Sequence, residues 1–443
     1  MRMIKVKTDK PSNTVPGQET WSGNPVGLFW EQSLVWGILC VKTLTDLGVP
    51  FHLLGADDIR TGCLERYRVL LVPGGWASHK VRVLGDAGRT RIASFIEQGG
   101  SYIGFCGGAG LALSSPPSLG LVPLERMPLT RRLPSASGTI QIRGNEHHPA
   151  WRNLPPDIPV SVWWPSQFGS SQCPGSTCVA SYWKTGADFQ VADIPVKEVI
   201  AGNFRWQDLE QAYGINLDPE RILGHPAILE VRSGRGLLIL SYPHLETPGD
   251  TWGNRLLFNM LRYLDSEAAM ALPSSAPPPP PCFDAPPGRA AARALEAAWR
   301  DAANLVAFGE QNLLWNRRGS WLLNWRRGIR GLEYGFLEVA LRCALDHLPA
   351  GPGGDAPYDP WVAPARKIEV EVRKFCSMAR ELLEEEKPAA RNGQLSKLGK
   401  VNRRVDDLRA RLFGTRMNHG GMCAQIFDDL DTLLLHLLRM NRP

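Results

Sequence analysis

One cysteine of this chain, Cys106, lies in a glycine-rich segment that follows a short apolar run. The run Ser101–Phe105 predicts a buried strand, and the small residues from Gly107 onward predict the start of a helix. A strand-to-helix turn of this kind presents its side chain at the carboxyl edge of a sheet. There the free N–H groups and the dipole of the helix favour a thiolate. We therefore predict that Cys106 is a nucleophile; the alternative is a small residue packed in a turn.

A base for this thiol is predicted at a second strand end. The run Gly236–Leu240 is another buried-strand pattern, and His244 follows it closely. Glu246 lies two positions further on, so in an extended segment it faces the same way and can accept the imidazole N–H. A lone histidine after a strand more often caps it or contacts solvent. Together with Cys106, however, the pair predicts a Cys–His–Glu triad.

Two glycines complete the predicted site. Gly74 and Gly75 follow a third apolar run, Arg68–Val72. A glycine pair after a strand is usually only a turn, but here the N–H groups of Gly75 and Gly107 are placed to form an oxyanion hole. Such a site needs no metal and no cofactor. Its expected substrate is a small-molecule amide or acyl compound.

Composition limits the classes of protein that this chain can represent. The 443 residues are 43% hydrophobic and 21% charged, which is typical of folded domains. A net charge of +6 is too small, over this length, to indicate a nucleic-acid-binding protein. No apolar run has the length of a signal peptide or a membrane span. The nine cysteines follow no disulfide pattern, which predicts reduced thiols and a cytoplasmic location.

Alternating apolar runs and amphipathic stretches predict an α/β fold with a parallel sheet and helices on both faces. Residues 139–235, rich in short β-like runs, predict an antiparallel insertion. A proline run marks a linker, and beyond it the helical period dominates, which predicts an all-α C-terminal domain. The predicted divisions are a flexible tail (1–20), the α/β domain (21–266), the Pro-rich linker (267–288) and the helical domain (289–443).

These motifs resemble a known family. The elbow around Cys106 and the His-x-Glu pair at His244 are similar to the class I glutamine amidotransferase superfamily, which has a flavodoxin-like sheet. Within it, the segments Tyr102–Gly110 and Ala227–His244 most resemble the biotin-protein ligase N-terminal-like group. The resemblance implies the fold and the triad. It does not imply glutamine as substrate, because the chain shows neither a synthetase domain nor a biotin-ligase catalytic domain.

Three further segments carry weaker indications. The pair His147-His148 and the spacing of Cys173 and Cys178 match no strong zinc template, so no metal site is predicted. The segment Trp163–Phe168 is expected near the catalytic edge, where an insertion in the resembled family tends to wall the pocket; the alternative is an aromatic core of the antiparallel extension. Leu313–Arg330 interleaves tryptophans with arginines. We expect a bundle helix with its tryptophans inward; the alternative is a surface for nucleic acid, whose association would depend strongly on salt.

The sequence thus predicts a cysteine-dependent amidohydrolase or amidotransferase-like protein. Its helical domain is expected to dock a protein partner, with no membrane contact. The alternative is a catalytically silent, amidotransferase-like binding or scaffolding protein. That alternative is favoured by the lack of an acceptor domain and opposed by the complete triad of Cys106, His244 and Glu246.

Overall fold

A computed structural model of the chain describes residues 20–169, 175–269, 288–348, 359–391, 401–414 and 420–440. Its centre is a sheet whose first five strands run parallel in the spatial order β2-β1-β3-β4-β11. These strands are apolar throughout because both of their faces are covered. They are β2 (Phe51–Leu54), β1 (Val26–Phe29), β3 (Val69–Val72), β4 (Ser101–Phe105) and β11 (Gly236–Ser241).

Helices cover both faces of these strands, as the sequence predicts. Alternate strand residues pack to opposite sides: Ile103 of β4 belongs to one apolar core and Tyr102 to the other. Helices α1 (Val35–Asp46) and α7 (Thr251–Glu267) contribute to the first core. The second core contains side chains of α2 (Ala56–Arg60), α3 (Ala77–Glu97) and α4 (Gly107–Ala112), and the short η1 (Cys63–Arg66) lies beside it.

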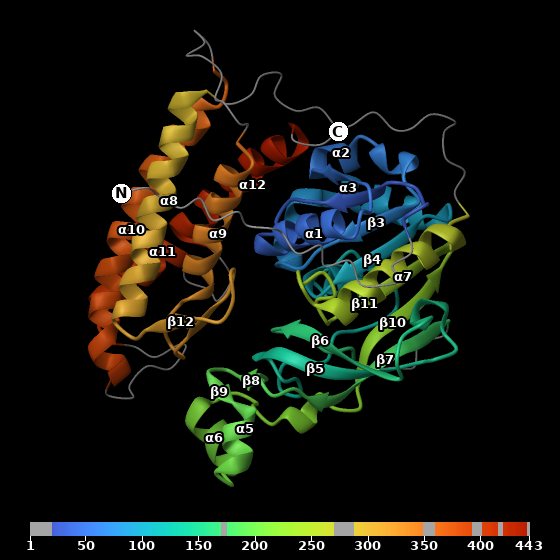
Figure 1. Cartoon of the computed structure of the whole chain (residues 1–443), viewed down its shortest axis with the longest axis horizontal. Helices are drawn as coiled ribbons and strands as arrows, with labels where there is room; N and C mark the ends of the chain where they lie inside the picture. Colours follow the sequence, from blue (N-terminus) through green and yellow to red (C-terminus); the bar gives the residue numbers. More distant parts are fainter. Residues whose placement is uncertain are drawn as a thin grey trace, which may run out of the picture.

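The predicted antiparallel insertion is present and continues the same sheet. Beyond β11 the order runs β10-β7-β5-β8-β9, all antiparallel, and β6 pairs with β5. The strands are β5 (Ala136–Gly144), β6 (Asp157–Trp163), β7 (Ser176–Thr185), β8 (Gln190–Val191), β9 (Ile194–Pro195) and β10 (Pro226–Ser233). Between them lie η2 (Pro149–Trp151), α5 (Val196–Ala201), α6 (Trp206–Tyr213) and η3 (Pro219–Arg221). Figure 1 shows α5 and α6 at the far end of these strands.

The C-terminal part is helical, with one exception. Its helices group beside the sheet in Figure 1 and are α8 (Arg289–Gln311), α9 (Leu332–Asp346), α10 (Val362–Arg391), α11 (Arg403–Phe413) and α12 (Gly421–Met440). The prediction of a bundle helix over Leu313–Arg330 is wrong, because this segment forms a hairpin of β12 (Trp315–Arg317) and β13 (Leu323–Trp325). The turn Arg318–Leu322 contains Gly319 and Ser320, which favour a turn over a helix.

The helical part packs directly against the sheet. The indole N–H of Trp30, just after β1, donates to the carbonyl of Asp431 in α12 at 2.8 Å. The Asp431 carboxylate accepts the N–H of Gln32 at 2.7 Å. One continuous apolar core extends from the side of α1 and α7 into helices α8–α12. The hairpin and helices that the sequence assigned to partner binding therefore have an intramolecular contact surface.

Some expectations fall outside the described residues. The tail 1–20, apart from its last residue, and most of the linker 267–288 belong to this group. No helix in the described part of the chain is long and apolar enough to cross a membrane.

Candidate active site

The three predicted site segments meet at one edge of the sheet. Gly74 follows β3, Cys106 follows β4 and His244 follows β11, and β3, β4 and β11 are adjacent parallel strands. The registers align them, since Gly104 is the partner of Val72 on one side and of Leu240 on the other. Parallel neighbours end at the same edge, so the topology brings these segments together.

Cys106 occupies a strained turn. Its backbone has φ 46° and ψ −100°, outside the usual regions for a non-glycine residue, and it is the N-cap of α4. Its N–H donates to the carbonyl of Ser241 at 2.7 Å, which ties the turn to β11. The side chain is partly exposed. A strained turn held by its neighbours presents the thiol at the sheet edge, as predicted.

The glycines after Cys106 are required by close backbone contacts. A Cβ on Gly107 would lie 1.8 Å from the carbonyl oxygen of Gly75, and one on Gly108 would lie 2.1 Å from that of Val72. Both neighbours are backbone atoms of the β3 strand and its following turn, so they have little room to move. The elbow and the glycine turn therefore pack as one unit.

This contact predicts the effect of a single methyl group. Gly107→Ala should lower the free energy of unfolding by about 1–3 kcal/mol, because the added carbon overlaps the Gly75 carbonyl. Urea denaturation measures the change. Gly319→Ala is the matched control, since its Cβ would meet nothing within 4 Å. Equal losses in the two variants would contradict the packing described here.

His244 and Glu246 form a buried pair. Nδ1 of His244 lies 2.7 Å from Oε1 of Glu246, and both side chains are fully buried. The segment is anchored by the N–H of His244, which donates to the carbonyl of Ser161 at 2.8 Å. Thr43 donates its hydroxyl to the carbonyl of Glu246 at 2.8 Å. The carboxylate thus orients the ring and fixes which of its nitrogens faces away.

Charge at the site favours a protonated imidazole. Burial by itself lowers the pKa of His244, but the Glu246 carboxylate and the Cys106 thiol together outweigh it and raise that pKa to about 10. The other ring nitrogen, Nε2, is buried and has no hydrogen-bond partner within the described residues. An imidazolium at neutral pH stabilises a thiolate beside it.

The predicted oxyanion-hole amides lie next to the elbow. Gly75 has φ 107°, which favours glycine, and a Cβ there would lie 2.3 Å from the carbonyl of Gln32. Within the described residues, the N–H groups of Gly75 and Gly107 donate to no acceptor. Gly74 lies against the His244 ring, since its Cβ would be 2.8 Å from Cε1. Two free amides beside the thiol are the donors that an oxyanion requires.

Aromatic side chains cover the pair, and the sequence analysis missed most of them. The Trp36 ring of α1 lies 4.2 Å from the His244 ring. Trp321 of the hairpin turn and Phe336 of α9 contact the Trp36 ring edge-to-face, at 5.4 and 5.7 Å. No local pattern marks these residues, because the contacts join distant parts of the chain.

The segment Trp163–Phe168 lies beside Cys106. The Cys106 thiol lies 4.0 Å from the carbonyl oxygen of Trp164. The Trp164 ring stacks on Trp325 of β13 at 5.3 Å. A hollow of about 630 Å³ elsewhere, lined by residues that include Trp183 and Lys197, lies away from this chemistry. The walls of the site come from both the antiparallel strands and the helical part.

The weak metal candidates have other roles or lie outside the described residues. His148 pairs through Nε2 with Glu230 at 2.8 Å, and its Nδ1 accepts the N–H of Ala150. Cys178 is a free thiol rather than part of a disulfide, and Cys173 is not among the described residues. In the described part of the chain, no group of three His, Cys, Asp or Glu side chains is placed to hold a metal ion.

Comparison with known proteins supports the resemblance over part of the α/β region. Residues 63–115 match the family model described as "Biotin-protein ligase, N terminal". That segment contains β3, β4 and the Cys106 elbow, and the resemblance inferred from the sequence is confirmed there. No curated protein matches the chain.

Solved structures of glutamine amidotransferase-like proteins are similar in part. A GMP synthase component from Thermoplasma acidophilum is 12% identical, with a TM-score of 0.37, over 56% of this chain and 96% of its own. PurLQS of Thermotoga maritima is 15% identical, with a TM-score of 0.36, over 55% and 100%. A glutamine amidotransferase of Thermotoga maritima is 15% identical, with a TM-score of 0.31, over 55% and 99%. At these TM-scores the likenesses establish no activity for this chain.

Proposed function

We propose that this protein is a cytoplasmic, cysteine-dependent hydrolase or transferase of amide or acyl compounds. One observation carries the proposal: the buried His244–Glu246 pair and the strained Cys106 elbow lie at adjacent strand ends. Nucleophile, base and orienting carboxylate are the three parts that thiol catalysis requires. The alignment of all three is harder to explain by packing alone than any one of them.

The proposed reaction uses only these side chains and water. The Cys106 thiolate attacks the substrate carbonyl carbon, and the N–H groups of Gly75 and Gly107 stabilise the oxyanion. His244 gives its proton to the departing amine or alcohol as the C–N or C–O bond breaks, which leaves a thioester. Water then loses a proton to His244 and attacks the thioester carbon. The C–S bond breaks, the acid leaves, and the thiolate and imidazolium are restored; an amine in place of water would give transfer.

The test is the relative reactivity of the free cysteines. Cys106 should react with iodoacetamide at pH 7 at least tenfold faster than Cys63, because burial raises the pKa of the Cys63 thiol to about 12. Burial also raises the pKa of the Cys40 thiol. Peptide mass spectrometry after brief labelling measures each rate, and Cys106→Ser identifies the signal. If Cys106 labels no faster than Cys63, the proposal fails.

A silent binding protein is the second candidate, and one observation favours it. His244 and Glu246 have no exposed surface; the Trp36 ring lies against the His244 ring, and Trp321 packs on Trp36. A fold that kept the triad only for packing would show the same cover. In that case Cys106 labels slowly in the intact chain, and the labelling experiment separates the two functions.

A further inference from the structure

Two arginines near Cys106 have no carboxylate partner among the residues that the structure describes. The Nη2 group of Arg126 donates to the carbonyl of Gly110 at 3.4 Å, and the backbone N–H of Arg126 donates to Ser115 Oγ at 2.8 Å. Arg132 donates through Nη1 to the hydroxyl of Ser166. Neither guanidinium pairs with a carboxylate of the described residues. Both side chains are half-buried, but the Nε of each guanidinium is buried without a partner among the described residues. A buried N–H donor left unpaired indicates a place for an acceptor.

Both arginines are tied to the segments that contact the thiol. Gly110, which accepts from Arg126, donates its own N–H to the carbonyl of Cys106 at 2.9 Å. Ser166, which accepts from Arg132, lies two residues after Trp164, whose carbonyl meets the Cys106 thiol. Burial and the like charge of Arg126 lower the pKa of Arg132, while the Cys106 thiol opposes that shift. Arg126 and Cys106 therefore lie close enough to Arg132 to influence it.

Hydrogen-bond donors without a partner lie around the two guanidinium groups. The Nε atoms of Arg126 and Arg132 are buried and have no hydrogen-bond partner within the described part of the chain. The hydroxyls of Tyr182 and Tyr242 are in the same state, although both residues are fully buried. The Tyr242 ring packs on Phe168 at 4.5 Å, and the backbone of Phe168 bridges to Arg126. The Tyr242 hydroxyl also lies beside Ser166, the acceptor of Arg132, and Arg132 interacts electrostatically with both Arg126 and Tyr242. This cluster of donors suits a ligand rich in acceptors.

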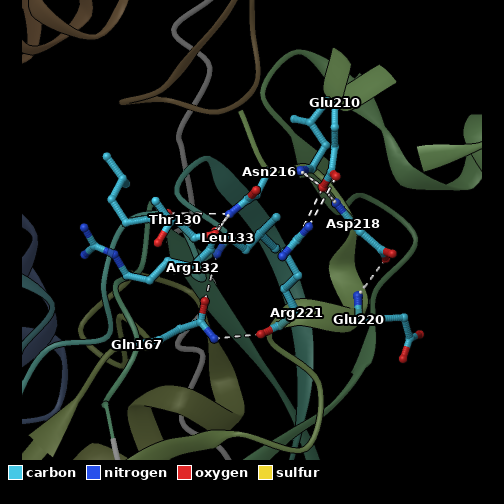
Figure 2. Close-up of polar contacts among 11 residues, drawn as sticks. Thr130, Arg132, Leu133, Gln167, Glu210, Asn216, Asp218, Glu220 and Arg221 are labelled. Carbon is cyan, nitrogen blue, oxygen red and sulfur yellow. Dashed lines mark hydrogen bonds and ion pairs between the residues drawn. The ribbon is translucent and has the colours of Figure 1, made fainter. Parts of the chain in front are cut away.

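The loop that carries Arg132 is held rigidly. Figure 2 shows Asn216 donating to the carbonyls of Thr130 and Arg132, at 3.0 and 2.7 Å. Gln167, which is fully buried, accepts the N–H of Leu133 at 2.8 Å and donates to the carbonyl of Arg221 at 2.7 Å. A guanidinium on a fixed loop is pre-organised for binding, because little of its freedom remains to be lost.

We propose that Arg126 and Arg132 bind an oxyanion group of the substrate, a carboxylate or a phosphate, beside the carbonyl that Cys106 attacks. The inference rests on the proposed function and narrows its substrate to anionic amide or acyl compounds. The planar fork of an arginine matches either oxyanion, and two forks with two phenols provide a full set of donors.

A pair of alkylating reagents tests this on the full-length protein. Iodoacetate and iodoacetamide share the reacting carbon and the leaving group, and they differ only in a carboxylate. The measured quantity is the ratio of their rates at Cys106. Arg132→Gln and Arg126→Gln should each lower this ratio about tenfold or more, with the iodoacetamide rate changed less than about twofold. Arg131→Gln, at the exposed neighbouring position, should leave the ratio unchanged.

A competition experiment identifies the group and does not depend on the folding of the variants. Acetate and inorganic phosphate are each added to the wild-type protein during iodoacetamide labelling. Protection of Cys106 by acetate indicates a carboxylate, and protection by phosphate indicates a phosphate. An unchanged ratio in both arginine variants, with no protection by either anion, overturns the inference alone. A Cys106 that reacts with neither reagent overturns the proposed function and this inference with it.

Discussion

Replacing His244 by Asn should slow the reaction of Cys106 with iodoacetamide about 30-fold at pH 7. An ordinary thiol with a pKa of about 8.5 is only about 3% ionised at that pH. In the proposed function, an imidazolium at His244, fixed by Glu246 at 2.7 Å, stabilises a thiolate beside it. Asn keeps the size of the ring approximately and removes its charge. The expected loss of rate, about 30-fold, is therefore the ratio between a fully ionised thiol and one that is only about 3% ionised.

The pH profile separates this effect from a change of structure. The pKa of His244 is raised to about 10, so the ring stays protonated through neutral pH and the wild-type rate should be nearly constant between about pH 7 and 9. In His244→Asn the rate should rise about tenfold per pH unit until an ordinary thiol is ionised. Initial labelling rates across this range give both profiles.

Two further variants sharpen the interpretation. Glu246→Gln removes the carboxylate that raises the pKa of His244, so its profile should lie between those of the wild type and His244→Asn. His147→Asn, at an exposed histidine, should match the wild type. If His244→Asn retains a flat profile, another group ionises the thiol and the triad is wrong.

Those parts of the site that lie at strand ends were predictable from the sequence. Cys106, Gly74 and His244 each follow an uninterrupted apolar run, and buried parallel strands have that pattern. The three segments then meet in one site only if the three strands are neighbours in the sheet. Their adjacency is a property of the topology, which the family resemblance supplied and periodicity alone did not.

The cover and the anion-binding arginines were not predictable in this way. Trp36 lies in a helical stripe that reads as ordinary core, and its contacts with Trp321 and Phe336 join segments far apart in the chain. Arg126 and Arg132 lie in an irregular segment with no period, so nothing local shows that both lack a partner. Only the assembled structure shows which charges are left unpaired.

The hairpin shows how a local pattern misleads. Tryptophans and arginines mixed along Leu313–Arg330 suit a helix with apolar and charged faces. In the structure the alternation is that of strands: Trp315 pairs with Trp325 across the hairpin, and Arg318 reaches the carbonyl of Asp188 at 2.6 Å. Packing against the antiparallel strands decides the conformation here, because tertiary contacts outweigh a weak helix preference.

Trp36→Ala should be among the most destabilising single substitutions in this chain. The side chain is 5% exposed and packs against the rings of His244, Trp321 and Phe336. Truncation of a buried tryptophan costs about 3–5 kcal/mol, because the lost contacts leave a cavity that the neighbours fill only in part. Urea unfolding of the full-length protein measures this loss.

The same substitution connects the cover to the chemistry. Water that reaches the vacated space would screen the attraction between Glu246 and the His244 ring, so the pKa of His244 should fall toward its ordinary value and Cys106 labelling at pH 7 should slow. Trp252→Ala provides the matched control: that indole is 36% exposed, and its removal should change the free energy of unfolding by only about 0.5 kcal/mol. If Trp36→Ala destabilises the protein but leaves the labelling rate unchanged, the helical part stabilises the fold and has no influence on the thiol. If the free energy of unfolding and the Cys106 labelling rate both fall, the hairpin and α9 belong to the active site as well as to the core.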